Sequence, residues 1–156
     1  MRSEGGRGTT CVIPIRGALP RHLRPGWLSY IAAGMGTDFT DLVAWQEAAR
    51  LAADVLGAAR RIRGLAGGSA ASQMVRAAES IPANIAEGYG RGLTADGARL
   101  LRVARASAAE LESHLRVAEL GGRLPSSDVA PLVARTRRVR ALINGLLRFA
   151  AQRVRH

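Results

Sequence analysis

The chain has 156 residues, of which 47% are hydrophobic and 22% are charged, values ordinary for a soluble globular protein. Its single cysteine, Cys11, excludes an intramolecular disulfide and a cysteine-based zinc site, and it favours a cytoplasmic protein. No run of 18 apolar residues occurs, so neither a transmembrane helix nor a membrane partner is expected. All 23 basic residues are arginines, and the net charge of +11 favours an anionic partner such as nucleic acid.

Residues 1–36 differ in composition from the rest of the chain. They hold seven of the 18 glycines and three of the six prolines, and they show no helical period. Two interpretations stay open: a disordered basic tail, or an upstream mis-start that translation from Met35 would leave out. The folded domain is expected over residues 37–156.

Two amphipathic helices are expected in the first half of this domain. The first spans about 39–63 and ends at Gly64, Gly67 and Gly68, and its inward stripe is Leu42, Gln46, Ala49, Ala53 and Leu56. The second spans about 70–91, and its stripe is Met74, Ala78, Ile81 and Ile85. Pro82 lies inside the second helix and should bend it. Gly88, Gly90 and Gly92 are interpreted as its C-cap and the following turn.

Two further helices complete the pattern. The third spans about 95–120 after an N-cap at Thr94, with its stripe at Leu101, Ala104, Ala108, Leu111, Leu115 and Ala118. The fourth spans about 127–154 with Pro131 in its first turn, and its stripe is Leu132, Thr136, Val139, Ile143, Leu146 and Ala150. Four such helices joined by short glycine-rich turns predict an all-α, antiparallel up-down four-helix bundle.

The third helix carries a second stripe, which includes Leu100, Val103, Ser107 and Glu110. Two interpretations are possible. The stripe is either an interface with another subunit, or the polar edge of one broad core face.

Unbalanced charge is concentrated in the fourth helix, where seven arginines from Arg135 to Arg155 face Asp128 alone, whereas charges balance within the other three segments. Arg137, Arg148 and Arg155 fall within about 20° of one another around the helix, opposite Val139. A face of this kind attracts a phosphate backbone with little sequence preference. The alternative is a solvated basic face that reflects genome composition. The predicted nucleic-acid-binding residues are Arg137, Arg138, Arg140, Arg148 and Arg155.

The sequence shows no arrangement of residues that is typical of a catalytic site. The three histidines have no second histidine or cysteine at ligand spacing, and His114 with Glu110 is interpreted as a surface pair. No nucleophile with an adjacent base is recognisable. We therefore expect no enzyme activity, cofactor, metal or small-molecule substrate.

The run from Ser80 to Arg91, SIPANIAEGYGR, is the most distinctive segment of the chain. It is similar to the signature of the 23S ribosomal RNA intervening-sequence proteins, a bacterial four-helix bundle family. The segments 41–46, 73–78, 107–112 and 144–146 also resemble this family. The resemblance implies an up-down bundle and a homopentamer. It also links the chain to the accessory variability determinant of diversity-generating retroelements, a basic pentamer thought to bind RNA and a reverse transcriptase.

Two departures weaken parts of this resemblance. The family often has a basic residue where Val75 stands, and the glycine-rich turn after Arg63 is shorter than in the family. The signature residues are Ile81, Pro82, Asn84, Glu87, Gly88 and Arg91. In the structural interpretation, Pro82 bends the helix, Asn84 bonds a carbonyl freed by the bend, and Glu87 pairs with Arg91. The alternative is a direct binding role for Asn84 and Glu87.

The sequence thus predicts a cytoplasmic, homo-oligomeric bundle that binds nucleic acid, RNA rather than DNA, through its fourth helix. The competing hypothesis is a protein-interaction scaffold, or an accessory subunit of a reverse transcriptase, whose charge is incidental.

Overall fold

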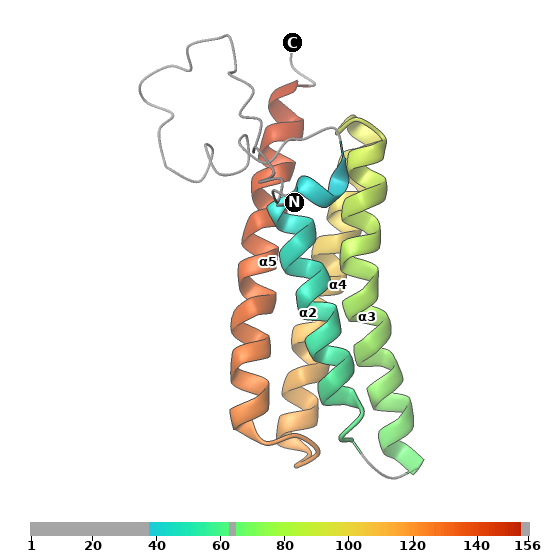
Figure 1. Ribbon diagram of the computed structural model, residues 1–156, viewed down its shortest axis with the longest axis vertical. Helices are drawn as coiled ribbons and strands as arrows, with labels where there is room; N and C mark the ends of the chain where they lie inside the picture. Colours follow the sequence, from blue (N-terminus) through green and yellow to red (C-terminus); the bar gives the residue numbers. More distant parts are fainter. Residues whose placement is uncertain (1–37, 63–64, 154–156) are drawn as a thin grey trace, which may run out of the picture.

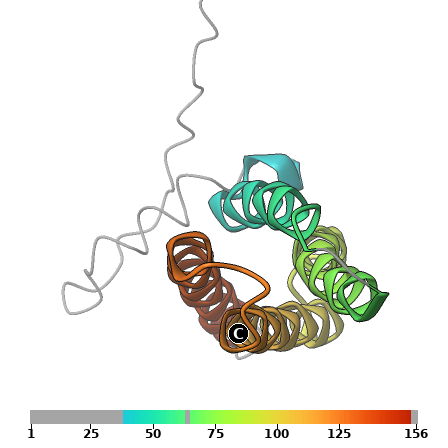
Figure 2. The same ribbon diagram turned by 90° about the horizontal axis from the view of Figure 1, so that it is seen from below.

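A computed structural model describes residues 38–62 and 65–153, and these residues form a short 3-10 helix followed by α-helices alone. The elements are η2 (Phe39–Asp41), α2 (Val43–Ala59), α3 (Leu65–Gly90), α4 (Ala95–Leu120) and α5 (Ser126–Arg153). Consecutive α-helices run in opposite directions (Figure 1) and surround one core when seen end-on (Figure 2). Contacts between α2 and α5 close the ring. The predicted four-helix bundle is confirmed, and the interpretations of residues 1–36 concern a segment outside the described ranges.

The inward stripes predicted for α4 and α5 are confirmed. All twelve of their residues are buried, and Leu101, Leu111, Leu115 and Ile143 have no exposed surface. The buried hydroxyl of Thr136 donates to the carbonyl of Leu132 at 2.7 Å, so this polar group is satisfied within its own helix.

The inward stripe predicted for α2 is wrong. Leu56 is 38% exposed, whereas the buried residues of the helix are Ala44, Ala48, Leu51, Val55, Ala58 and Ala59. Leu42 is buried, but it is the N-cap and has an extended backbone, with φ −71° and ψ 121°. Counting a helical period from Leu42 therefore started outside the helix. Because alanines lie on several sides of α2, the hydrophobic pattern gave no other way to identify the inward side of this helix.

The inward residues of α3 are confirmed, since Met74, Ala78, Ile81 and Ile85 are all buried. The expected break at Gly67 and Gly68 is wrong, because α3 begins at Leu65 and contains both. Glycine lowers the stability of a helix by about 0.5–1 kcal/mol relative to alanine, but its backbone adopts helical angles freely, so the two glycines do not end the helix.

The two helix-internal prolines are accommodated without a break. α3 continues through Pro82. The Asn84 side chain donates to the carbonyl of Ser80 at 2.8 Å, whereas the carbonyl that lacks its amide because of Pro82 belongs to Ala78. The expectation that Asn84 bonds the freed carbonyl is therefore wrong. Pro131 is the sixth residue of α5 and lies beyond its first turn, because α5 begins at Ser126.

The α3–α4 turn is shaped by glycines in two different ways. Gly88 is not the C-cap but lies inside α3, where a Cβ on it would come 2.9 Å from the carbonyl oxygen of Gly97. A Cβ on Gly97 would come 2.5 Å from the oxygen of Gly88, so the two backbones touch. Gly92 has φ +73°, a conformation that favours glycine. Leu93 follows with φ +55° and is buried, and the predicted Thr94 N-cap is confirmed by its bond from the Gly97 amide.

Candidate nucleic-acid interface

The arginines of α5 reach across two seams of the bundle, because α5 packs between α2 and α4. Arg137 and Arg140 reach a glutamate of α4, whereas Arg135 and Arg138 reach acids of α2. Val139, between them in sequence, is buried. One stretch of α5 therefore anchors the helix by its apolar side and presents guanidinium groups along both edges.

On the α4–α5 seam, Glu112 is shared by two arginines. Its side chain is only 16% exposed. Arg137 donates from Nε at 2.8 Å to Glu112 Oε1, and its Nη2 lies 2.6 Å from the same oxygen. Arg140 Nη1 lies 3.4 Å from Oε2, a buried oxygen that accepts no hydrogen bond from the described residues. Arg140 is therefore held near Glu112 by charge alone.

On the α2–α5 seam, Glu47 is shared in the same way. This side chain is 17% exposed, with Arg50 Nη1 at 3.3 Å from Oε1 and Arg138 Nε at 3.6 Å from Oε2. Beyond this cluster, towards the start of α5, the acids and arginines pair one to one. Arg135 pairs with Asp54, and Arg61 Nη2 lies 2.9 Å from Asp128.

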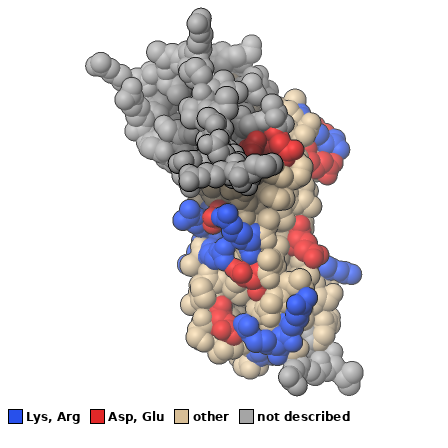
Figure 3. All heavy atoms as spheres, viewed as in Figure 1, with Lys and Arg blue, Asp and Glu red and all other residues tan. Residues whose placement is uncertain are grey.

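The two seams define what we call the α5 arginine belt: Arg50, Arg137, Arg138 and Arg140 around Glu47 and Glu112. The carboxylates are recessed, whereas Arg137 and Arg138 are 58% and 59% exposed. Two arginines for each carboxylate leave a net positive charge on each seam. Figure 3 shows basic and acidic side chains intermixed on the side of the bundle where α5 and α2 lie.

The expectation of an uncompensated cationic face on α5 is therefore corrected. Acids that lie 25 to 91 positions away in sequence neutralise part of its charge, and the balance within one helix could not reveal them. Arg148 is exposed further along α5 and takes part in an interaction of its own. Arg155 lies outside the described ranges.

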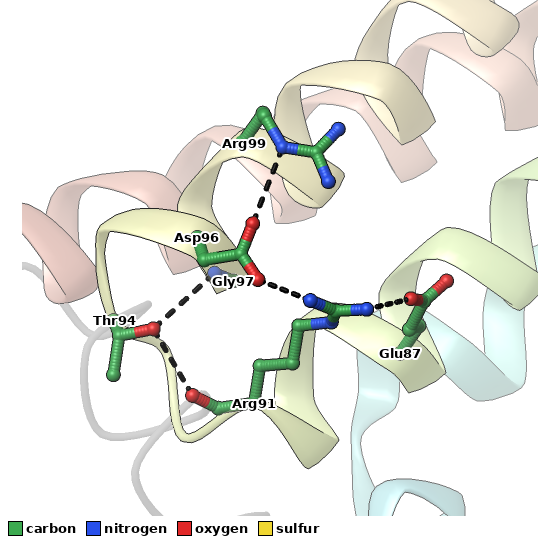
Figure 4. Close-up of polar contacts among 6 residues, drawn as sticks. All are labelled: Glu87, Arg91, Thr94, Asp96, Gly97 and Arg99. Carbon is green, nitrogen blue, oxygen red and sulfur yellow. Dashed lines mark hydrogen bonds and ion pairs between the residues drawn. The ribbon is translucent and has the colours of Figure 1, made fainter.

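The signature residues gather where α3 meets α4, and they bond to one another and to α4. Arg91 binds Glu87 at 2.6 Å and also Asp96, and Asp96 accepts from Arg99 Nε at 3.2 Å (Figure 4). The predicted pairing of Glu87 with Arg91 is confirmed. The Arg91 hydrogen bond is the main cause that lowers the pKa of Asp96, and the same contact, with Glu87, raises the pKa of Arg91. The Asp96 carboxylate therefore stays ionised at neutral pH.

The second stripe of α4 is divided between the interior and the surface. Leu100 and Ser107 are buried within the single chain, and Ser107 Oγ lies 2.9 Å from Ser80 Oγ of α3. Val103 is 39% exposed, and Glu110 is also exposed. The residues predicted as a subunit interface thus do not form one continuous outer face, because the α3–α4 contact covers two of the four.

Other kinds of site would need a cluster of metal ligands or an apolar helix long enough to span a membrane. The described ranges contain no group of three or more His, Cys, Asp or Glu side chains that could hold a metal ion. His114 Nε2 lies 3.6 Å from Glu110 Oε1, one helical turn apart, as expected for a surface pair. In those ranges, no helix combines the length and the apolar character needed to cross a membrane.

Comparison with known proteins agrees with this architecture. The family model described as 23S rRNA-intervening sequence protein matches residues 40–145, which run from η2 into α5. No curated protein matches the chain.

Proposed function

We propose that this chain, which belongs to the 23S rRNA-intervening sequence protein family, is a cytoplasmic, non-enzymatic protein that binds RNA through the α5 arginine belt. It acts as a homo-oligomer, a pentamer by resemblance to its relatives. The observation that carries the RNA-binding proposal is the ratio in the belt, where two arginines surround each recessed carboxylate on both seams.

The recessed carboxylates explain how the belt would take up a phosphate. Glu112 holds Arg137 through two nitrogens, which fixes the position of that side chain. Arg138 and Arg140 donate no hydrogen bond to the described residues, so their planar guanidinium groups keep their donors for a phosphate oxygen. A phosphate placed there would satisfy donors that the protein itself leaves unused.

Such a site distinguishes a polyanion from other ligands but does not read its bases. Contacts to phosphate fix position and orientation and carry no sequence information directly. We therefore expect binding to RNA with weak sequence preference and strong dependence on salt, because each bound phosphate releases condensed counterions.

The experiment is retention of a structured RNA by the full chain over a series of salt concentrations. We expect affinity to fall steeply with salt, and the double variant Arg138→Gln with Arg140→Gln to bind about tenfold more weakly at low salt. Arg135→Gln with Arg61→Gln is the matched control, since it removes the same charge from two one-to-one ion pairs. Affinity that is independent of salt, or equal losses in both double variants, would contradict the proposal.

A second candidate is a protein-interaction scaffold, for instance an accessory subunit of a reverse transcriptase. The observation that favours it is the apolar outer face of α4, where Val117 is 62% and Leu120 88% exposed. Exposed apolar residues that cluster on one face mark contact sites for protein. Salt-independent capture of a protein partner, with no retention of RNA, would select this candidate.

A further inference from the structure

An outward ridge runs along α4. Its residues recur at spacings of three and four, the repeat with which one helix packs along another. The α4 ridge consists of Val103, Ala106, Glu110, Ser113, Val117 and Leu120. All six are exposed, and Glu110 is its one charged member, 57% exposed, with His114 Nε2 of the same helix 3.6 Å from its Oε1. The ridge is therefore an apolar surface with a single acid near its middle.

A shallow groove of about 420 Å³ lies between α2 and α3. The α2–α3 groove is lined by Ala59, Ala71 and Val75, and Arg60, Arg76 and Glu79 stand at its rim. Neither Arg60 nor Arg76 makes an ion pair with any described residue. Groove and ridge thus have opposite shapes. Arg60 and Arg76 outnumber Glu79 at the groove, whereas Glu110 is the one charged residue of the ridge, so the net charges of the two surfaces have opposite signs.

Arg76 and Glu110 lie at nearly the same height along the bundle. Ser80 of α3 bonds Ser107 of α4, which fixes these two residues at one level. Arg76 lies four residues before Ser80 and Glu110 three residues after Ser107, descents of about 6 and 4.5 Å along antiparallel helices. A second copy related by rotation about an axis parallel to the bundle would bring its Glu110 to the level of Arg76.

We infer that the α4 ridge of one copy seats in the α2–α3 groove of the next, with Glu110 against Arg76. This inference rests on the self-association in the proposed function and names the two surfaces that carry it. The contact is heterologous, because two different patches meet, and repeated contacts of this kind close into a ring when the rotation allows. The α5 arginine belt takes no part in it and stays available for RNA.

The test is a charge swap measured by light scattering of the full chain after size exclusion. Wild type should run as an oligomer. Glu110→Arg and Arg76→Glu should each shift the mass towards the monomer, and the double variant should restore the oligomer. Asp41→Arg, at an exposed position of η2 outside both surfaces, is the matched control and should leave the mass unchanged.

The outcomes separate the inference from the proposed function. An oligomer that tolerates both single swaps, or a double variant that stays dissociated, overturns the ridge-in-groove contact while self-association stands. A monomeric wild type overturns self-association as well. The RNA-binding part of the proposed function then depends on the retention experiment alone. Helical circular dichroism shows whether each variant folds, and Val117→Ser, which shortens the ridge without a change of charge, should also weaken the oligomer.

Discussion

At the α3–α4 turn one arginine is held by two carboxylates, whereas on the α5 seams one carboxylate is held between two arginines. Arg91 contacts Glu87 and Asp96, and the addition of Arg99 balances the charge. Glu112 contacts Arg137 and Arg140, and no further acid joins them among the described residues. The same residue types therefore build a closed network in one place and a positively charged one in the other.

This difference separates two uses of arginine that composition alone cannot distinguish. In the closed network the charges balance within the chain, and the result is a fixed turn between α3 and α4. In the belt some donors stay unused, and surplus charge remains at the surface. The signature residues are thus best tested through stability, and the belt through binding.

The largest effect is expected where the two backbones touch at the α3–α4 crossing. Gly97→Ala places a Cβ 2.5 Å from a carbonyl oxygen, so the helices must move apart, and we expect the free energy of unfolding to fall by about 2–3 kcal/mol. Denaturation by urea measures this change. Gly57→Ala is the control, since open space surrounds Gly57 inside α2, and alanine there should stabilise by about 0.5–1 kcal/mol. Equal effects at both positions would show that the crossing is not tight.

The role of the belt in RNA binding can be tested by comparing the two arginines that share one carboxylate. Arg137 donates a hydrogen bond to Glu112, and Arg140 does not. Arg140→Gln should therefore weaken RNA binding about threefold more than Arg137→Gln, although each removes one charge. Fluorescence anisotropy at fixed low salt measures the ratio. A ratio of one would mean that only the total charge of the surface matters.

Removal of the shared carboxylate acts in the opposite direction. Glu112→Gln leaves Arg137 and Arg140 without their acid, so the slope of log affinity against log salt should steepen by up to about one unit. Asp41→Asn adds the same charge at an exposed position of η2 and should change the slope less. Salt titrations of both variants measure the two slopes. Equal slopes would show that Glu112 is not part of the RNA-binding site.

The smallest effect concerns acid stability at the turn. Because Arg91 lowers the pKa of Asp96, this ion pair stabilises the fold above the ordinary aspartate pKa of 3.8, and that stabilisation is lost as pH falls through the lower, folded value. Asp96→Asn should therefore lower the melting temperature at pH 7, and the difference from wild type should vanish near pH 2. A difference that persists at pH 2 would assign another role to Asp96.

The sequence predicted the fold and most of the core because leucine and isoleucine mark the inward sides of α3, α4 and α5. It failed on α2, where alanines surround the helix and only Leu51 and Val55 distinguish the true inward side from that of Leu56. The 3-10 turn before α2 shifted the starting point of the count as well.

The candidate site could be predicted only in part. The excess of arginine on α5 is visible in the sequence, but its partners are not, since Glu112 and Glu47 belong to other helices. One indication was available in the sequence, because both glutamates lie at the edge of the inward stripe of their helix. That position does not reveal which arginine forms the ion pair. The contact between Gly88 and Gly97 was likewise hidden, because a glycine that allows close approach looks the same as one that ends a helix.

Leu93 occupies a left-handed backbone conformation with its side chain inside the core. Glycine would relieve the backbone there but empty the space beneath the hairpin, and a β-branched residue would fill the space while worsening the backbone. A substitution at this position must therefore both tolerate the left-handed backbone and fill the core. Few residues other than leucine meet both requirements.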